Sequence, residues 1–397
     1  MKKITILALH LGYGGIERAI SSLANLLCKE YEITIVSTYK LYDKPAFAVD
    51  KRVKIEYLIE GDLPKRVENY KVFLLKGKLG SLAKALWKDY ISKLHLWSLC
   101  KDGVSGIMMY KKRKDKMIAY IKECDSDIIL STRDIHNDWL SFYGKESAYK
   151  IGWEHNHHNG DENYSNKVIH SVQNLDAFVL VSKDLFHFYK EKLKETKCKC
   201  FYIPNFIDGI SKVPSDVKGN HLVSVGRLSK EKGHVDLIEV LHLLRIKGID
   251  FHLDIIGAGP EEDRIREKIK AYDLTSYITL HGFLGKEQMA PLLEKASIFL
   301  LPSYTESFGL VILEAFAYGI PAIAFDSAQG ATEIIENGWD GYLIENRDKE
   351  KMAKRIIELL NSYNRRVIMG RNAIKKAKKY TALTIKKDWK DLFEKER

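Results

Sequence analysis

Two glutamates eight positions apart, Glu306 and Glu314, are the residues best placed to bind a polar ligand. They follow an apolar run at 297–301, in a segment that we expect to turn from a loop into a helix near Gly309 with Ser307 as its cap. Backbone N–H groups at a helix start favour a phosphate, whereas carboxylates repel it and suit neutral hydroxyls. Eight helical residues span roughly 12 Å. The spacing therefore suits a diphosphate with a sugar at each end.

A second charged set, Arg227 and Lys232, lies between Gly226 and Gly233, just after an apolar run at 221–226. Arginine binds phosphate oxygens through two N–H groups at once, and lysine adds a mobile point charge. Loops that follow parallel strands lie at the ligand-binding edge of an α/β sheet. An ordinary solvated loop is the alternative for this pair, as a surface helix is for the two glutamates.

Three histidines, His155, His157 and His158, follow the expected strand 148–153 and raise the question of a metal. Zinc sites need three or four ligands in a tight geometry, and the helical H-E-x-x-H spacing is absent. We therefore expect no metal here. An imidazole at His155 can hydrogen-bond a sugar hydroxyl; a loop histidine bonded to the backbone is the alternative.

Glycines mark three other predicted strand ends. Gly14 and Gly15 follow the first strand, where a side chain would block the approach of the backbone to a ligand. This is not a G-x-G-x-x-G sequence, so we do not expect a nicotinamide site. Gly259 and Phe283 lie in loops that end successive later strands, and turn geometry alone would explain the glycine.

Apolar runs of strand length alternate with helical periodicity nearly throughout the chain. This alternation predicts an α/β protein with two doubly wound, Rossmann-like parallel-sheet domains and a ligand cleft between them. We expect residues 1–204 to form the N-terminal domain, 205–379 the C-terminal domain and 380–397 a terminal helix. The expected strands are 3–9, 32–38, 53–59, 127–131, 148–153, 177–181, 199–203, 221–226, 251–256, 278–280, 297–301, 321–325 and 341–344.

Composition agrees with a globular protein of two domains, because 397 residues with 45% hydrophobic content suffice for two cores. The five cysteines have no metal-ligand spacing and their odd number argues against a disulfide framework, so we expect reduced thiols and a cytoplasmic location. The apolar run after Met1 stops at His10, which fits a first strand better than a secretory signal. No run reaches the ~18 apolar residues that a membrane span needs.

The net charge of +11 comes from one segment, residues 64–122, which holds 15 Lys or Arg against four acidic residues. Apolar and aromatic residues interleaved with lysine suit a helix on an anionic membrane surface. An amphipathic helix that covers the first sheet explains the segment equally well. We expect no nucleic-acid binding, because no groove-reading motif accompanies the charge.

Three motifs together resemble the large retaining glycosyltransferase family 4, also described as glycosyl transferases group 1, which has the GT-B fold. They are the Glu-x7-Glu pair with Ser-Phe-Gly after its first member, the Gly-Arg-x5-Gly segment and the Gly-Gly-x-Glu-Arg segment from Gly14. The resemblance covers nearly the whole chain and is strongest over 221–342. It implies a bacterial surface-polysaccharide enzyme, cytoplasmic or peripheral on the inner face of the membrane. Its reaction would be metal-independent transfer of a sugar from a nucleoside-diphosphate sugar, with UDP favoured over GDP, to a hydroxyl of a glycan or lipid-linked acceptor.

The resemblance also assigns roles. It implies catalytic roles for Glu306, His155, Arg227 and Lys232, and donor or nucleotide binding by Gly15, Gly259, Phe283, Ser307, Phe308, Gly309, Leu310 and Glu314. It implies no cofactor, and a terminal helix that crosses back onto the N-terminal domain. Two alternatives stay open, a nucleotide-sugar epimerase on the same fold and a non-catalytic protein that binds membranes or nucleic acid.

Overall fold

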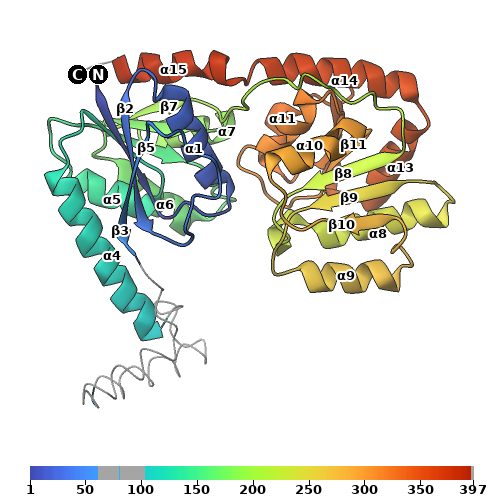
Figure 1. Cartoon of the computed structure of the whole chain (residues 1–397), viewed down its shortest axis with the longest axis horizontal. Coiled ribbons are helices and arrows are strands. Elements are labelled where there is room, and N and C mark those ends of the chain that lie inside the picture. Colours follow the sequence, from blue (N-terminus) through green and yellow to red (C-terminus); the bar gives the residue numbers. More distant parts are fainter. Residues whose placement is uncertain (61–79, 81–102, 395–397) are drawn as a thin grey trace. The chain divides into compact units, whose positions relative to one another are not determined.

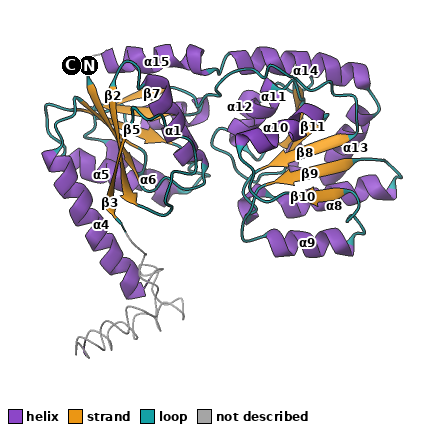
Figure 2. Ribbon diagram, in the orientation of Figure 1, coloured by secondary structure: helices purple, strands orange, loops and turns teal. Residues whose placement is uncertain are grey.

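The computed structural model describes residues 1–60, 80 and 103–394, which form two parallel sheets flanked by helices (Figures 1 and 2). The first sheet contains β1 (Lys3–Ala8), β2 (Glu32–Tyr39), β3 (Lys54–Ile59), β4 (Ile128–Ser131), β5 (Tyr149–Glu154), β6 (Ala177–Leu180) and β7 (Lys199–Tyr202). The second contains β8 (His221–Val225), β9 (His252–Ile256), β10 (Ile278–Leu280), β11 (Ile298–Leu301), β12 (Ala322–Phe325) and β13 (Gly341–Ile344). Every strand predicted from the sequence is present, and the α/β fold class is confirmed.

Helices connect the strands. Those before residue 200 are α1 (Gly15–Leu27), α4 (Gly103–Glu123), α5 (Asp134–Tyr143), α6 (Glu162–Val172) and α7 (Lys183–Lys192). Those after it are α8 (His234–Ile246), α9 (Glu262–Ala271), α10 (Lys286–Lys295), α11 (Leu310–Ala317), α12 (Gln329–Ile334), α13 (Lys349–Leu360), α14 (Tyr363–Lys378) and α15 (Ala382–Glu394). Two short 3-10 turns, η1 (Lys230–Lys232) and η2 (Glu345–Arg347), precede α8 and α13.

Both sheets have a point where the strand order changes direction. The orders are β3-β2-β1-β4-β5-β6-β7 and β10-β9-β8-β11-β12-β13, and the pairings are parallel, as between Phe299 of β11 and Val223 of β8. The chain winds one way from β1 or β8 and then restarts on the other side at β4 or β11. The loops after β1 and β4, and those after β8 and β11, therefore lie at the switch points where doubly wound sheets bind ligands.

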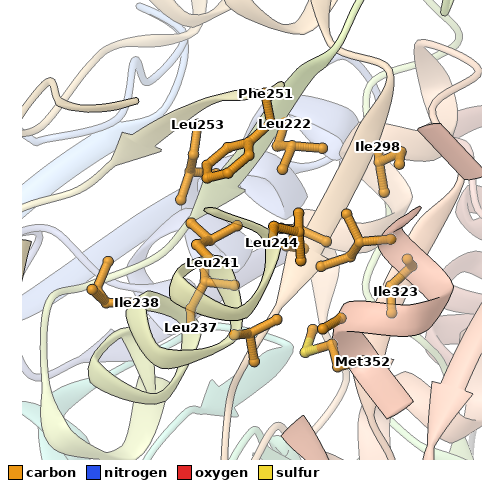
Figure 3. Close-up of a cluster of buried hydrophobic side chains, with 14 of the residues drawn as sticks. Leu222, Leu237, Ile238, Leu241, Leu244, Phe251, Leu253, Ile298, Ile323 and Met352 are labelled. Carbon is orange, nitrogen blue, oxygen red and sulfur yellow. The ribbon is translucent and has the colours of Figure 1, made fainter. Parts of the chain in front are cut away.

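A buried apolar cluster fixes the helix that follows β8 (Figure 3). Leu237, Leu241 and Leu244 recur at helical spacing on one face of α8 and point toward the second sheet. They pack in one cluster with residues of β8, β9, β11, β12 and α13, among them Leu222, Leu253, Ile298, Ile323 and Met352. Because this face is buried, the start of α8 and the preceding loop with Lys232 are held at the edge of the sheet.

The described residues separate into two compact units. Unit 1 contains Met1–Trp153, Asn166–Phe178 and Leu193–Lys199, and unit 2 contains Glu154–Ser165, Val179–Lys192 and Cys200–Arg397. The domain boundary at 204/205, the separate terminal segment 380–397 and the cleft between the domains stay predictions.

The basic segment 64–122 is described only in part, since residues 61–79 and 81–102 lie outside the described residues. In α4, Met117 and Ile121 are buried, as in a helix that covers a sheet. Membrane binding by this segment stays a prediction. Within the described ranges, no helix is long and apolar enough to cross a bilayer.

Candidate active site

Lys232 and Glu306 meet at the switch point of the second sheet. The Lys232 Nζ lies 2.5 Å from the Glu306 Oε1, and the Ser303 Oγ donates to the same carboxylate oxygen at 2.9 Å. The two side chains are 23% and 13% exposed, so solvent and ligands still reach the pair. Two residues that the sequence assigned to one site, 74 positions apart, are thus in contact.

Backbone contacts tie their loops together. The Tyr304 N–H donates to the Glu231 carbonyl at 2.8 Å, which joins the loop after β11 to the loop after β8. Gly233 has a left-handed φ of 67°, and a Cβ there would lie 2.1 Å from the Pro302 carbonyl oxygen. Only glycine fits such a conformation and approach without strain. The relative position of Lys232 and Glu306 is therefore set mainly by the main chain.

Arg227 lies in the same loop, with its side chain 66% exposed. Its Nη2 donates to the Glu231 Oε1 at 2.9 Å, and the Ser229 Oγ donates to that oxygen at 2.6 Å. Burial raises the pKa of Glu231, but the hydrogen bonds from Ser229 and Arg227 outweigh it and leave the pKa below its usual value. Glu231 is therefore a carboxylate near neutral pH, and an incoming anion must compete with it for Arg227.

The cap of α11 differs from the prediction, although the helix begins where it was expected, near Gly309. The helix begins at Leu310 with Gly309 as its N-cap at φ 87°, and no side chain caps it, so the cap predicted at Ser307 is wrong. The left-handed turn at Gly309 bends the chain sharply before the helix. Glu306 consequently lies in the loop, and a helical rise of roughly 12 Å does not describe its distance from Glu314.

Phe308 and Glu314 are both buried. Phe308 packs edge-on against Tyr380, with ring centroids 5.7 Å apart. A Cβ at Gly330 would lie 2.3 Å from the Phe308 backbone, and the Gly330 N–H donates to the Glu306 carbonyl at 2.8 Å. Glu314 is the one charged residue in the otherwise apolar helix α11. The role predicted for Glu314 at the ribose stays a prediction.

Gly259 and Phe283 border the same sheet edge. A Cβ at Gly259 would lie 2.4 Å from the Leu228 carbonyl oxygen, while one at Gly257 would lie 1.8 Å from the Gly226 carbonyl oxygen. Close backbone packing therefore explains these glycines without a ligand. Phe283 is exposed. Nucleotide binding by Gly259 and Phe283 stays a prediction.

Unit 1 also has a carboxylate and a guanidinium in contact at the switch point of its sheet. Arg133 follows β4, and its Nη2 donates to the Glu17 Oε1 of α1 at 2.7 Å. The His10 Nδ1 is 3.6 Å from the same oxygen. Burial lowers the pKa of His10, with Glu17 opposing this change. A Cβ at Gly14 would lie 2.1 Å from the other Glu17 oxygen, whereas at Gly15 nothing lies within 4 Å. Packing within the protein therefore does not require glycine at Gly15, the first residue of α1, and its role in donor binding stays a prediction.

His155 follows β5 and is buried. The Glu154 Oε1 accepts the backbone N–H groups of His155 at 2.9 Å and of Asn156 at 2.7 Å. This carboxylate holds the turn that carries His155. The role predicted for its imidazole at the donor sugar stays a prediction.

The other two histidines form a cluster with Asp184, whose potential ligand atoms lie within 4.8 Å of one another. Backbone N–H groups donate to the Nδ1 of His157 at 2.9 Å and to the Nδ1 of His158 at 3.1 Å. The His157 Nδ1 also lies 3.0 Å from the Asn159 Oδ1, and the His157 Nε2 lies 2.8 Å from the Asp184 Oδ2. These hydrogen bonds account for the contacts within the cluster, and the absence of a metal stays a prediction.

Sequence reasoning missed several residues that hold these loops. They are Ser303, Tyr304, Asp236, Gly330 and Arg347 in unit 2, and Arg133 in unit 1. Apart from Asp236, each lies within a few residues of the carboxyl end of a strand or in the connection that follows it, which is the signal that was available. Their residue types alone carry no such signal, since none belongs to a recognised motif.

Comparison with known proteins finds similarity to bacterial polysaccharide enzymes. Residues 208–376 match the family described as glycosyl transferases group 1. An exopolysaccharide phosphotransferase of Streptomyces coelicolor is 26% identical over 385 residues, 96% of this chain, and the chain spans 39% of that protein's length. An alpha-1,4-N-acetyl-D-galactosaminyltransferase of Campylobacter jejuni, named for a PP-undecaprenol-linked acceptor, is 24% identical over 98% of this chain and 97% of its own length.

A solved structure extends the similarity to the fold of the full chain. A point mutant of Staphylococcus aureus TarM, in complex with Fondaparinux, alpha-GlcNAc-glycerol and UDP, superposes with a TM-score of 0.77 at 18% identity. The match covers 99% of this chain and 100% of that chain. The protein therefore has the GT-B fold of two Rossmann-like domains, and its residues 208–376 are similar to the family described as glycosyl transferases group 1.

Proposed function

We propose that the protein is a retaining glycosyltransferase of surface-polysaccharide synthesis. It moves a sugar from a nucleoside-diphosphate sugar, with UDP favoured, to a hydroxyl of a glycan or lipid-linked acceptor. The observation that carries this proposal is the contact of Lys232 with Glu306 at the switch point, beside Arg227. The UDP in the TarM complex and the names of the relatives support the donor and acceptor classes.

In this proposal the two cations and the start of α11 bind the diphosphate. Arg227 and Lys232 exchange their contacts with Glu231 and Glu306 for phosphate oxygens. The backbone at Phe308, Gly309 and Leu310 adds N–H donors at a helix N-terminus, which favours negative charge. Positive groups at the leaving diphosphate stabilise the charge that develops as the glycosidic bond breaks, an effect of about 3–4 kcal/mol per well-placed donor.

Glu306, Glu314 and His155 then serve neutral hydroxyls. Glu306 accepts from hydroxyls of the donor sugar, Glu314 accepts from the ribose and His155 bonds a sugar hydroxyl. The bond from the anomeric carbon to the leaving phosphate oxygen breaks, and a bond to the acceptor oxygen forms on the same face. The leaving phosphate takes the acceptor's proton, so no separate base or protein nucleophile is required.

A donor screen tests the proposal. UDP-, GDP- and ADP-sugars are compared by thermal shift, where a ligand at 100 times its Kd stabilises by about 2.7 kcal/mol. The stabilising donor is then incubated with glycan and lipid-linked acceptors. Transfer with the anomeric configuration kept supports the proposal, and inverted product contradicts the retaining mechanism. Turnover of the donor without any acceptor indicates the epimerase, and no turnover of any nucleotide sugar indicates a non-catalytic protein.

Metal independence is part of the proposal. The Nδ1 atoms of His157 and His158 accept backbone N–H groups, and the His157 Nε2 is hydrogen-bonded to Asp184. We therefore expect EDTA to leave the transfer rate unchanged. A loss of rate that Mg²⁺ or Mn²⁺ restores would show that a metal holds the diphosphate instead.

A further inference from the structure

Arg347 is an arginine of unit 2 that contacts the loop carrying Glu306, and no motif includes it. It follows β13, and its side chain is 16% exposed. Its Nη1 donates to the Ser303 carbonyl at 2.9 Å, and its Nη2 donates to the Pro302 carbonyl at 2.9 Å. One guanidinium thus holds two consecutive carbonyls, three and four residues before Glu306.

The same guanidinium is enclosed by aromatic rings and a carboxylate. Its central carbon lies 3.5 Å from the ring centroid of Tyr304 and 4.3 Å from that of Phe325. Asp236 accepts from the Arg347 Nη2 and from the Tyr304 hydroxyl, each at 2.7 Å. These contacts fix the plane of the guanidinium, so its donors keep their direction.

Arg347 also reaches the loop that carries Lys232. A Cβ at Gly233 would lie 3.1 Å from the Arg347 Nη2, next to the Pro302 carbonyl that this nitrogen binds. The Tyr304 N–H, one residue after the held carbonyls, donates to the Glu231 carbonyl of that loop. The guanidinium therefore lies where the loops of Glu306 and Lys232 pack together.

The backbone at Arg347 is strained. Asn346 and Arg347 have φ of 54° and 52°, so two consecutive residues other than glycine adopt the left-handed conformation. Each costs on the order of 1 kcal/mol, and such strain persists where the surrounding contacts require it. Here the turn sends the Arg347 side chain back toward residues 302 and 303.

We propose that Arg347 is a positioning residue for sugar transfer: its fork on the Pro302 and Ser303 carbonyls holds Glu306 against Lys232 in the geometry that the donor requires. This inference rests on the proposed function. It assigns to Arg347 no contact with the donor, so its loss lowers turnover more than nucleotide binding. The strained turn is the cost of aiming the side chain.

Arg347→Gly is the informative variant, because glycine accepts a left-handed φ and removes the strain together with the guanidinium. We expect kcat to fall at least tenfold, while the Kd for UDP changes less than threefold. Arg347→Lys keeps the charge but has no fork, and should regain only part of kcat. Arg355→Ala, which removes an arginine paired with Glu358 and stacked on Tyr342, is the matched control and should behave as the unmodified protein.

Hydrogen exchange tests the positioning role without relying on activity. In Arg347→Gly, the amides of Tyr304 and Gly330, both bonded across these loops, should exchange at least tenfold faster while the strands of the second sheet keep their rates. Unchanged exchange at both amides overturns the proposal, as does equally faster exchange throughout unit 2, which would indicate a general structural role. If the unmodified protein transfers no sugar, the proposed function fails, whereas the exchange result still decides whether Arg347 holds the loop.

Discussion

Each sheet has an acidic side chain paired with a basic one at its switch point, but the two side chains follow opposite strands in the two sheets. In unit 1 the carboxylate, Glu17, comes from the connection after the first strand and the cation, Arg133, follows β4. In unit 2 the cation, Lys232, comes first and the carboxylate, Glu306, follows β11. The two sheets thus share one topology, but the carboxylate and the cation have swapped places between the two connections.

The supports of the two carboxylates differ more than their partners do. Glu17 lies on the buried side of α1 and is 5% exposed, while Glu306 lies in a loop and is 13% exposed. A helix with a buried face holds a side chain through packing against the core, whereas the Glu306 loop is held by hydrogen bonds to its backbone. We infer that the Glu17 pair serves the fold of unit 1 and that the Glu306 pair serves a ligand.

Glu306→Gln tests the ligand half of this comparison and has the largest expected effect. The amide keeps the shape but loses the charge that accepts donor hydroxyls and faces Lys232. We expect turnover to fall by about 10²–10³-fold, the scale for one electrostatic group in an active site, with little change in UDP affinity. Glu358→Gln, which removes a carboxylate paired with Arg355, is the control. Near-normal transfer by Glu306→Gln would show that the charge of Glu306 has no part in the reaction.

Arg133→Met tests the structural half. It leaves Glu17 buried without its ion-pair partner, so we expect the free energy of unfolding of unit 1 to fall by about 3 kcal/mol. The double variant Glu17→Gln/Arg133→Met should recover most of this loss in chemical denaturation. If the single and double variants are equally stable, Glu17 and Arg133 do not depend on each other and the comparison fails.

Asp340→Asn tests a buried carboxylate of unit 2 through the pH dependence of stability. Asp340 precedes β13, and its burial raises its pKa to about 6. As pH rises from about 4 to 6, the unfolded chain loses this proton while the folded chain keeps it, so stability falls by on the order of 2 kcal/mol and stays lower above pH 6.

Asparagine cannot ionise, so Asp340→Asn should gain stability relative to the unmodified protein over that range. The gain should appear in the unfolding of unit 2 and be absent at about pH 4, near the ordinary pKa of an aspartate. Parallel stability curves for the two proteins across this range would show that Asp340 ionises normally.

Arg227→Ala has the smallest expected effect, because this side chain is largely exposed. One charge-assisted contact screened by solvent is worth about 1.4 kcal/mol, so UDP affinity should fall about tenfold, and turnover with it. Arg264→Ala, which removes a similarly exposed arginine paired with Glu261, provides the control in isothermal titration. An equal loss in both variants would show that only net charge matters.

The sequence predicted the strands and the charged pair of unit 2 because both follow from local patterns. Apolar runs bounded by turn residues fix the strands, and parallel order then brings loop residues such as Lys232 and Glu306 to one edge. The start of α11 near Gly309 was predicted correctly, but its cap was not, because Gly309 caps the helix in a left-handed conformation that residue type alone does not indicate.

Other features could not be predicted because they depend on long-range packing. Arg347 acquires its role from two carbonyls 44 and 45 positions away and from a strained turn that a Glu-Asn-Arg sequence does not suggest. Arg133 likewise depends on Glu17, 116 positions away. Residue type alone does not distinguish these arginines from the many that lie in solvent.

The internal pairing of Arg227 with Glu231 and of Lys232 with Glu306 has a consequence for competing anions. Each of these cations is already neutralised within the protein, so an anion small enough to reach only one of them replaces one negative partner by another and gains little. A ligand that binds both cations, and whose hydroxyls also bind the two released carboxylates, gains binding free energy from each of these contacts. Selection against free phosphate would then come from the number of simultaneous exchanges rather than from the strength of any single charge.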